Sequence, residues 1–209
     1  MKTITNYLEK VIIGQILSDG YVERTGVNCR LSFSFGGAYL EYANWIGIQD
    51  YCSNSVYSVV SVTKEKKYTN YRLKTRTNSI FNKYREMFYI MQNNGKYRKA
   101  INIGDLPIVL AHLIMGDGTF STRDNRVRIC TYSFSFEECT MLADAIKKKC
   151  AISCKVLLDR ADSSGEKQYI LTIGKNSLMK LQEVVLPHMH KSMLYRIGLT
   201  FLFYRIVLL

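Results

Sequence analysis

Apolar residues in this chain recur every three or four positions in some segments and alternate with polar residues in others. Because the first spacing places side chains on one face of a helix and the second on one face of a strand, the pattern predicts secondary structure. In the first part of the chain it predicts helices at residues 5–20, 38–52 and 79–91 and strands at residues 21–24, 29–35, 56–63 and 68–76. The predicted order is α-β-β-α-β-β-α.

The second part of the chain repeats this order. Pro107 stands where helices tolerate proline near their start, and Ser135 and Glu138 form a capping box ahead of another helix. The pattern predicts helices at residues 107–118, 135–150 and 177–186 and strands at residues 119–121, 126–131, 154–158 and 168–173. We therefore expect an α+β fold of two similar halves, residues 1–92 and 107–209, joined by a polar linker at residues 93–106.

One short phrase occurs twice. It reads IIGQILSDG at residues 12–20 and LAHLIMGDG at residues 110–118, in each case an apolar helical run with a small residue ahead of Asp-Gly. The two aspartates, Asp19 and Asp117, are 98 residues apart in a chain of 209 residues. A duplication of this kind predicts that each half contributes one carboxylate to a shared centre.

Small residues on the two predicted helices favour close packing. Gly14 and Ser18 share one helical face, and Gly116 gives the second helix a small position as well. Helices packed there would bring the two aspartates side by side, and neighbouring carboxylates raise each other's pKa unless a cation lies between them. Because helix C-termini and carboxylate oxygens both favour a hard cation, the arrangement indicates a magnesium site. The alternative, a plain Asp-Gly turn after each helix, is less favoured because the phrase recurs in matching contexts.

Cationic and hydroxyl side chains alternate with apolar ones on several predicted strands. Alternate residues of a strand point to the same face, so these side chains share one surface in each half. The set is Arg30, Ser32, Ser34, Arg72, Lys74, Arg76, Arg126 and Arg128. Arginine and lysine on such a face can bond guanine edges and neutralise phosphates along a duplex groove. The alternative is an ordinary solvated sheet face, but recurrence in both halves favours DNA contact.

The overall charge favours a polyanionic partner. Lysine and arginine number 29 against 17 aspartates and glutamates, a net charge of +12, which is typical of proteins that bind nucleic acid or an anionic membrane. The six cysteines form no C-x-x-C pair, so we expect reduced, mostly buried thiols rather than a zinc site. No secretory signal is visible ahead of the first helix. The apolar residues 197–209 are too few to span a bilayer, and they form either a last packed helix or an extension of the reading frame.

These features resemble the LAGLIDADG homing endonucleases, in the single-chain form with two motifs. The resemblance rests on both motif helices, on the repeated element order and on residues 190–197, which read HKSMLYRI and are similar to the closing phrase of the organellar intron-encoded branch. It covers nearly the whole chain. The resemblance implies a saddle-shaped monomer whose two four-stranded sheets straddle a long, nearly asymmetric duplex site, with the motif helices at the interface between the halves.

The resemblance also implies roles for individual residues. Asp19 and Asp117 would bind Mg2+, for which Mn2+ would substitute, and each metal centre would help one water to attack one DNA strand, leaving a staggered double-strand break. Lys99 and Arg196 would each lie near a scissile phosphate. Family members usually have lysine in place of Arg196, and arginine keeps the charge but cannot deprotonate. His112 stands where the first motif has glycine, and we expect it to pack at the interface.

Two other functions stay open beside the endonuclease. An intron maturase, a splicing cofactor that binds intron RNA on the same fold, would have a similar sequence, although loss of an aspartate would have favoured it more. A DNA-binding protein without cleavage activity is expected if Arg196 fails to replace lysine. We favour the endonuclease because both aspartates are present. The expected location is an organelle, above all the mitochondrial matrix, or another reducing compartment inside the cell, and not the secretory route.

Overall fold

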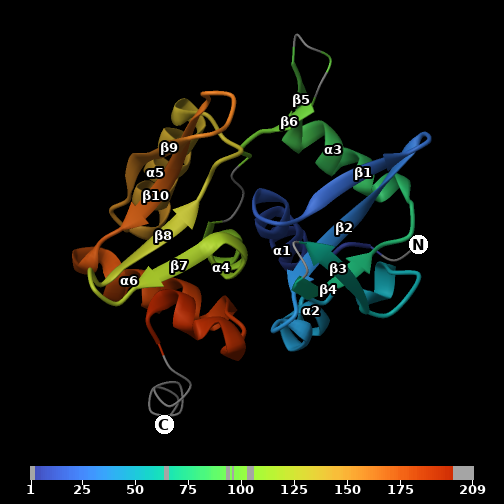
Figure 1. Ribbon diagram of the computed structural model, residues 1–209, viewed down its shortest axis with the longest axis horizontal. Helices are drawn as coiled ribbons and strands as arrows, with labels where there is room; N and C mark the ends of the chain where they lie inside the picture. The colour runs from blue at the N-terminus through green and yellow to red at the C-terminus, as the bar shows by residue number, and fades with distance from the viewer. Residues whose placement is uncertain (1–2, 64–65, 93–94, 96, 103–105, 200–209) are drawn as a thin grey trace.

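Each half of the chain folds into a four-stranded antiparallel sheet with its own helices (Figure 1). The computed structural model describes residues 3–63, 66–92, 95, 97–102 and 106–199. The elements of the first half are α1 (Asn6–Leu17), β1 (Tyr21–Thr25), β2 (Asn28–Gly36), α2 (Leu40–Trp45), β3 (Tyr57–Thr63), β4 (Lys66–Lys74) and α3 (Asn82–Phe88). A short hairpin of β5 (Tyr89–Met91) and β6 (Tyr97–Lys99) follows. Those of the second half are α4 (Leu106–Asp117), β7 (Gly118–Ser121), β8 (Arg126–Cys130), α5 (Phe136–Cys150), β9 (Lys155–Ala161), β10 (Lys167–Ile173) and α6 (Lys175–Val185).

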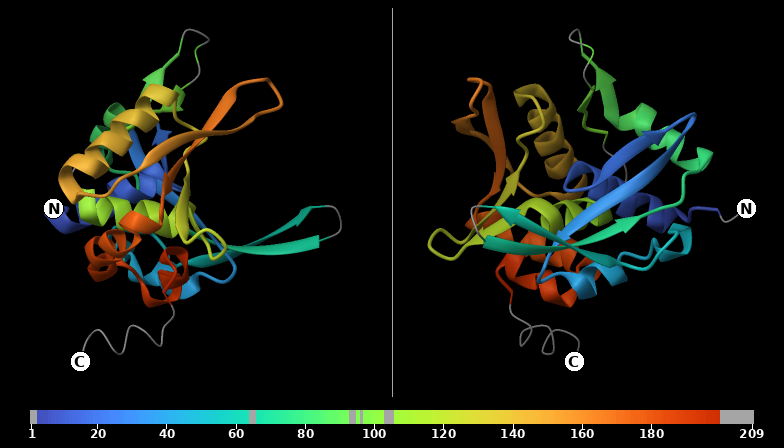
Figure 2. Two further views of the ribbon diagram at one scale, coloured as in Figure 1. Left: turned by 90° about the vertical axis from the view of Figure 1, so that its left-hand side faces the viewer. Right: turned by 45° about the vertical axis from the view of Figure 1, so that its right-hand side comes forward.

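The two sheets have the same topology. Their strand orders are β1-β2-β4-β3 and β7-β8-β10-β9, so the second sheet repeats the connections of the first. Helices α1 and α4 pack against each other between the sheets (Figure 1). Figure 2 shows that the β3–β4 and β9–β10 hairpins project to the same side of the molecule, away from α5. The predicted α+β fold of two similar halves with the motif helices at their interface is confirmed.

Local sequence explains how the principal helices begin. The Thr5 hydroxyl accepts a hydrogen bond of 3.2 Å from the Leu8 amide at the start of α1. At the start of α5, Ser135 accepts from the Glu138 amide at 3.3 Å, and the Glu138 carboxylate accepts from the Ser135 amide at 2.9 Å. These bonds satisfy amides that the first turn of a helix leaves without partners. The capping interpretations of both segments are therefore confirmed.

One predicted helix, at residues 38–52, is wrong in its length. The α-helix α2 ends at Trp45, and residues Gln49–Tyr51 form a separate 3-10 turn, η1. Gly47 lies between them with φ of +76°, a left-handed conformation that glycine adopts without a steric penalty and that ends a right-handed helix. The apolar spacing runs on through this break, which is why periodicity alone predicted one long helix.

The prediction of a helix at residues 79–91 is wrong at both ends. A 3-10 turn, η2 (Ser79–Phe81), precedes α3, and the chain then becomes the strand β5, whose partner β6 lies inside the predicted linker. Tyr89 anchors the start of β5 to the first sheet. Its ring is buried, and its hydroxyl accepts a hydrogen bond of 3.0 Å from the Val22 amide on β1. The Ala100 amide also donates to the Phe88 carbonyl at 2.8 Å, which closes the hairpin.

The C-terminal part of the second half contains two 3-10 turns that no periodicity predicted, η3 (Leu186–His188) and η4 (Lys191–Ile197). The apolar tail beyond residue 199 lies outside the described residues, as do residues 93–94, 96 and 103–105 of the linker. In the part of the chain that is described, no helix is long and apolar enough to cross a membrane. Four of the six cysteines, Cys29, Cys52, Cys139 and Cys150, are buried, which confirms that the thiols are mostly buried.

The helices α1 and α4 approach each other so closely that their contact requires glycine. A Cβ at Gly14 would lie 2.6 Å from the Cβ of His112 and 2.8 Å from the Val109 carbonyl oxygen. A Cβ at Gly116 would lie 2.5 Å from the Cβ of Ser18. Each distance is shorter than van der Waals contact, so any larger residue would push the helices apart. The predicted close packing at small residues is therefore present.

A polar cluster lies within the same interface. His112 is completely buried, its Nδ1 lies 3.2 Å from both the Gln15 Nε2 and the Tyr42 hydroxyl, and its ring stacks on Trp45 at a centroid distance of 5.6 Å. Burial lowers the pKa of His112 to about 3, because the low-dielectric interior disfavours the charged imidazole. His112 therefore packs at the interface as a neutral residue, as expected from the sequence.

We expect Gly14→Ala to lower the free energy of unfolding by about 2 kcal/mol, because overpacking outweighs the roughly 1 kcal/mol by which alanine favours a helix. Urea denaturation would measure this change. Gly174→Ala is the matched control, since a Cβ there meets no atom within 4 Å, and we expect it to cost less than about 1 kcal/mol. Equal stability of the two variants would contradict the account of the helix contact.

A second prediction concerns pH. The pKa of His112 is lower in the folded chain, about 3, than the roughly 6.5 of an unfolded histidine, so the unfolded chain binds more protons between these values. The stability contributed by the neutral imidazole is present above pH 6.5 and is lost as the pH falls. Between pH 7 and pH 5 the wild type should lose about 2 kcal/mol more of its free energy of unfolding than His112→Asn does. If the free energy of unfolding fell equally with pH in both proteins, the prediction would be wrong, because His112 would then be protonated equally well in the folded and unfolded chain.

Candidate active site and nucleic-acid interface

Asp19 and Asp117 lie at the C-terminal ends of the two packed helices, Asp117 as the last residue of α4 and Asp19 two residues beyond α1. Both line one pocket of about 210 Å3, here named the carboxylate pocket. Its other lining residues are Leu17, Ser18, Cys130, Thr131, Tyr132, Ser133 and Phe134. The structure thus brings together the two carboxylates that the repeated phrase singles out.

The two predicted basic residues are not part of the pocket lining, but both are close enough to the aspartates to lower their pKa. The Lys99 ammonium, on β6, donates a hydrogen bond of 2.8 Å to the Ser18 carbonyl at the end of α1. The Arg196 guanidinium, in η4, donates from Nη1 to the Gly118 carbonyl just after α4. Each cation is therefore held at the end of one motif helix, next to that helix's aspartate. Both helix ends have partial negative charge, which stabilises a cation there.

Burial and mutual repulsion set the ionisation of the carboxylates. Burial raises the pKa of Asp117 to about 7, and the charge of Asp19 adds to the rise, whereas Lys99 and Arg196 oppose it. Burial also raises the pKa of Asp19 against the same two cations. The pKa of Lys99 falls to about 8 through burial, although both aspartates favour its charged form. The two side-chain cations thus do not fully offset burial, and a further cation would stabilise the ionised carboxylates.

The donor set of the carboxylate pocket fits a magnesium ion. Among the described residues no group of three or more histidine, cysteine, aspartate or glutamate side chains is placed to hold a metal, so Asp19 and Asp117 are the donors in question. Mg2+ is commonly bound by one or two carboxylates together with waters and substrate phosphates, because it gives up its hydration water reluctantly. Two hard oxygen donors in a pocket that also contains hydroxyl groups match this requirement, whereas a structural zinc site would need more side-chain ligands.

Most of the predicted DNA-binding residues of the first half share one face of its sheet. Strands β2 and β4 pair Ser32 with Lys74 and Ser34 with Arg72, while the intervening Leu31, Phe33 and Leu73 are buried on the other face. Arg30 lies on the same face as Ser32, two residues away on β2. The predicted alternation of polar and apolar faces is therefore present on these strands.

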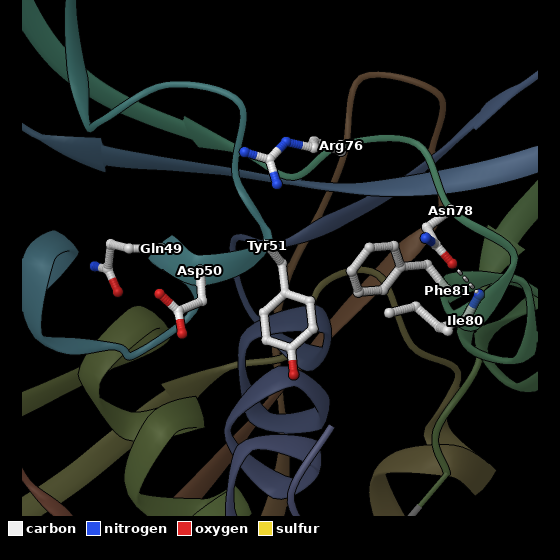
Figure 3. A pocket seen from close by; sticks show the side chains of 7 residues that line it. All are labelled: Gln49, Asp50, Tyr51, Arg76, Asn78, Ile80 and Phe81. Carbon is white, nitrogen blue, oxygen red and sulfur yellow. Dashed lines mark hydrogen bonds between the residues drawn. The ribbon is translucent and has the colours of Figure 1, made fainter. Parts of the chain in front are cut away.

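Arg76 is placed differently from the other cations of this set. It lies beyond the end of β4 and lines a pocket of about 510 Å3 together with Gln49, Asp50, Tyr51, Asn78, Ile80 and Phe81 (Figure 3). The alternation that grouped Arg76 with Arg72 and Lys74 is therefore wrong at its end, because the regular strand stops two residues before Arg76. We keep Arg76 as a predicted DNA contact apart from the group on the sheet face.

Carboxylates that the sequence analysis did not single out hold several of these cations. Arg30 donates to Glu23 from Nε and Nη2, both at 2.8 Å, and Lys74 lies 3.6 Å from the same carboxylate. The hydrogen bond from Arg30 is the main reason that the pKa of Glu23 lies below its usual value. Glu23 faces Arg30 across the β1–β2 ladder, so pairing the two predicted strands in register could have identified the contact.

The second sheet presents its cations in a similar way. Arg126 lies 2.6 Å from Asp124 and Arg128 lies 2.6 Å from Asp159, whose other oxygen accepts from the Tyr132 hydroxyl at 2.6 Å. These groups are exposed or half-buried, so the ion pairs can open when another anion competes. Both sheets therefore have arginines whose side chains are ordered by a neighbouring carboxylate.

Comparison with known proteins identifies the family. The model of the LAGLIDADG DNA endonuclease family matches residues 9–181, which is most of the chain. This chain belongs to the LAGLIDADG DNA endonuclease family. Intron-encoded endonuclease ai4 of Dictyostelium discoideum is 27% identical over 154 residues, which cover 71% of this chain and 93% of that protein. Cytochrome b mRNA maturase bI2 of Saccharomyces cerevisiae is 23% identical over 201 residues, which cover 90% of this chain and 46% of the maturase.

Solved structures of LAGLIDADG proteins have the same fold. The homing endonuclease I-WcaI, bound to its DNA recognition sequence, superimposes with a TM-score of 0.78 at 22% identity, covering 96% of this chain and 89% of that one. I-DmoI, in complex with DNA and Mn, gives a TM-score of 0.50 at 14% identity, with coverages of 86% and 96%. The resemblance inferred from the two motifs and from the element order is confirmed.

Proposed function

We propose that this LAGLIDADG protein is a site-specific endonuclease that cuts both strands of a long, asymmetric DNA duplex. The observation that carries the proposal is the meeting of Asp19 and Asp117 in one pocket, with Lys99 and Arg196 bound at the same two helix ends. The relatives described as intron-encoded endonucleases support this class of activity. Because one chain supplies both carboxylates, the proposed active form is a monomer.

Asp19 and Asp117 are the proposed ligands of Mg2+, and Mn2+ is expected to substitute because both ions accept oxygen donors. A divalent cation bound there would lower the pKa of a water and stabilise charge on the leaving 3′ oxygen. Lys99 and Arg196 would neutralise the scissile phosphates and orient them. Arg196 acts through charge and hydrogen bonds alone, since a guanidinium does not release its proton in proteins.

The sheets are the proposed DNA-binding surface. Their exposed faces have the predicted cations of β2, β4 and β8, and the whole chain has a net charge of +12. A duplex along these faces would compete with Glu23, Asp124 and Asp159 for the arginines, so phosphate or guanine acceptors would replace carboxylates that already order those side chains. Serines of the same face, Ser32 and Ser34, are small enough to let a base edge approach.

Intron maturation is the second candidate function. It is favoured by the match to the yeast maturase, which extends over 90% of this chain, although the chain spans less than half of the maturase's length. The presence of both aspartates favours cleavage over this function and over a DNA-binding protein that does not cut. The similarity to two intron-encoded endonucleases and to a cytochrome b mRNA maturase supports an organellar location such as the mitochondrial matrix.

The test of the proposed function begins with a randomised duplex library that is incubated with the protein, with and without Mg2+, before its cut ends are sequenced. Mg2+-dependent breaks at one long sequence, with matched staggered ends, are expected. On the recovered duplex, Asp19→Asn and Asp117→Asn should each abolish double-strand cleavage but leave binding largely intact, because each removes one cation ligand and no sheet contact. Either variant cutting at the wild-type rate in Mg2+ would rule out the shared cation site.

Binding should weaken steeply with salt, because each neutralised phosphate releases counterions and contributes about −0.9 to the slope of log affinity against log salt. Removal of a single phosphate contact, as in Arg72→Ala or Arg128→Ala, should reduce the magnitude of this slope by about 1. Lys180→Ala is the matched control, since Lys180 is paired with Glu183 on α6 and belongs to neither sheet. Titrations at several salt concentrations measure the slopes. A flat dependence in the wild type would contradict binding along the sheets.

A further inference from the structure

The two basic residues of the site lie on segments that are each bound to a helix of the opposite half. The β5–β6 hairpin, which ends in Lys99, follows the first half and contacts the start of α5 in the second. The η4 turn, which contains Arg196, belongs to the second half and contacts the start of α2 in the first. Two crossed contacts, here named the α5 brace and the α2 brace, therefore join the halves beside the carboxylate pocket.

The α5 brace consists of a short charged bond. Arg98 Nη1 donates to the Glu138 carboxylate at 2.6 Å and to the Lys99 carbonyl at 3.0 Å. Glu138 is well shielded, with 13% of its side chain exposed, and also accepts from the Ser135 amide at 2.9 Å. Charge-assisted bonds in a shielded site are stronger and more directional than exposed ion pairs. The backbone that presents Lys99 is thus fixed to the capping box of α5.

The α2 brace holds the Arg196 side chain directly. The Tyr39 and Tyr195 hydroxyls are 2.8 Å apart, and Arg196 Nη2 donates to the Tyr39 hydroxyl at 3.4 Å. The guanidinium also lies 5.6 Å from the centre of each of the two tyrosine rings. Its Nη1 donates to the Gly118 carbonyl, so the planar group is fixed on several sides. Tyr39 comes from the first half, immediately ahead of α2.

Long cationic side chains are easily misplaced, because many rotamers are accessible to them. Each hydrogen bond restricts these rotamers and so helps to fix the position of the charge. We propose that Glu138 and Tyr39 are positioning residues, Glu138 for Lys99 and Tyr39 for Arg196, and that each therefore controls cleavage of a different DNA strand. This inference rests on the proposed function, in which each basic residue serves one scissile phosphate. Loss of one brace should leave the other cation in place, because the two braces share no residue.

The experiment measures cleavage of each strand separately. The duplex recovered from the library is labelled on one strand at a time and is cut in a single turnover with saturating protein and Mg2+. We expect Tyr39→Phe to slow one strand roughly three- to tenfold, because it removes the hydrogen bond to Arg196. We expect Glu138→Gln to slow the opposite strand by a similar factor, because it removes the negative charge that strengthens the bond from Arg98. Nicked duplex should accumulate with both variants, and the affinity for DNA should stay at the wild-type value.

The variants are chosen to preserve the fold. Glutamine keeps the capping box, since it can still accept from the Ser135 amide, and phenylalanine keeps the ring that packs on Arg196. Tyr195→Phe removes the other hydroxyl of the α2 brace and should slow the same strand as Tyr39→Phe. Tyr51→Phe is the control, because its hydroxyl binds the Thr3 carbonyl away from the pocket, and it should change neither strand.

A double-mutant cycle tests whether Tyr39 acts through Arg196. In the Arg196→Lys background, Tyr39→Phe should change strand cleavage by less than about twofold, because an ammonium group lacks the planar fork that reaches the hydroxyl. Three results would overturn the inference: equal slowing of both strands by each variant, slowing of the same strand by both variants, or no slowing at all. In each of these cases, cleavage by the wild type would still support the proposed function. A wild type that cuts no duplex would overturn the proposed function and this inference together.

Discussion

The close contact between α1 and α4 is the constraint on which the rest of the structure depends. Gly14 and Gly116 let the two backbones meet with no room for a Cβ, and this places both helix ends in the same pocket. Burying two carboxylates there is unfavourable by itself, because burial raises the pKa of both and the charge of Asp19 raises the pKa of Asp117 further. Lys99 and Arg196 offset part of that cost, and a divalent cation would offset more. We therefore expect the ionised site to be most stable when a divalent cation is bound.

The duplicated topology places a sheet on each side of the contact between α1 and α4. Two sheets with the same strand order flank the helix pair, and each presents a face on which arginine is ordered by a carboxylate of the same sheet. In the free protein these proposed DNA-contacting arginines are held in ion pairs within each sheet, which limits self-repulsion in a chain of net charge +12. The same arrangement favours selectivity, because a ligand must compete with fitted carboxylates such as Glu23 and Asp159.

Local patterns in the sequence predicted those elements whose defining contacts join residues only a few positions apart. The capping box at Ser135, the alternation on β2 and the two Asp-Gly helix ends depend on spacings of two to four residues, which a sequence displays directly. The β5–β6 hairpin escaped prediction because its anchor, the bond between Tyr89 and Val22, joins residues 67 positions apart. Tyr39 and Tyr195 are 156 positions apart, and no periodicity connects them. Long-range pairs of this kind follow from the packing of the halves and become visible only in three dimensions.

The central claim is that Asp19 and Asp117 share a divalent cation when the protein is bound to DNA. The most direct measurement is anomalous X-ray scattering from Mn2+ in crystals of the protein with its recovered duplex, collected for the wild type and for Asp117→Asn. The account predicts manganese density between the two carboxylates of the wild type and its loss or marked weakening in the variant. Density at another place in an actively cutting complex, or unchanged density in the variant, would contradict it.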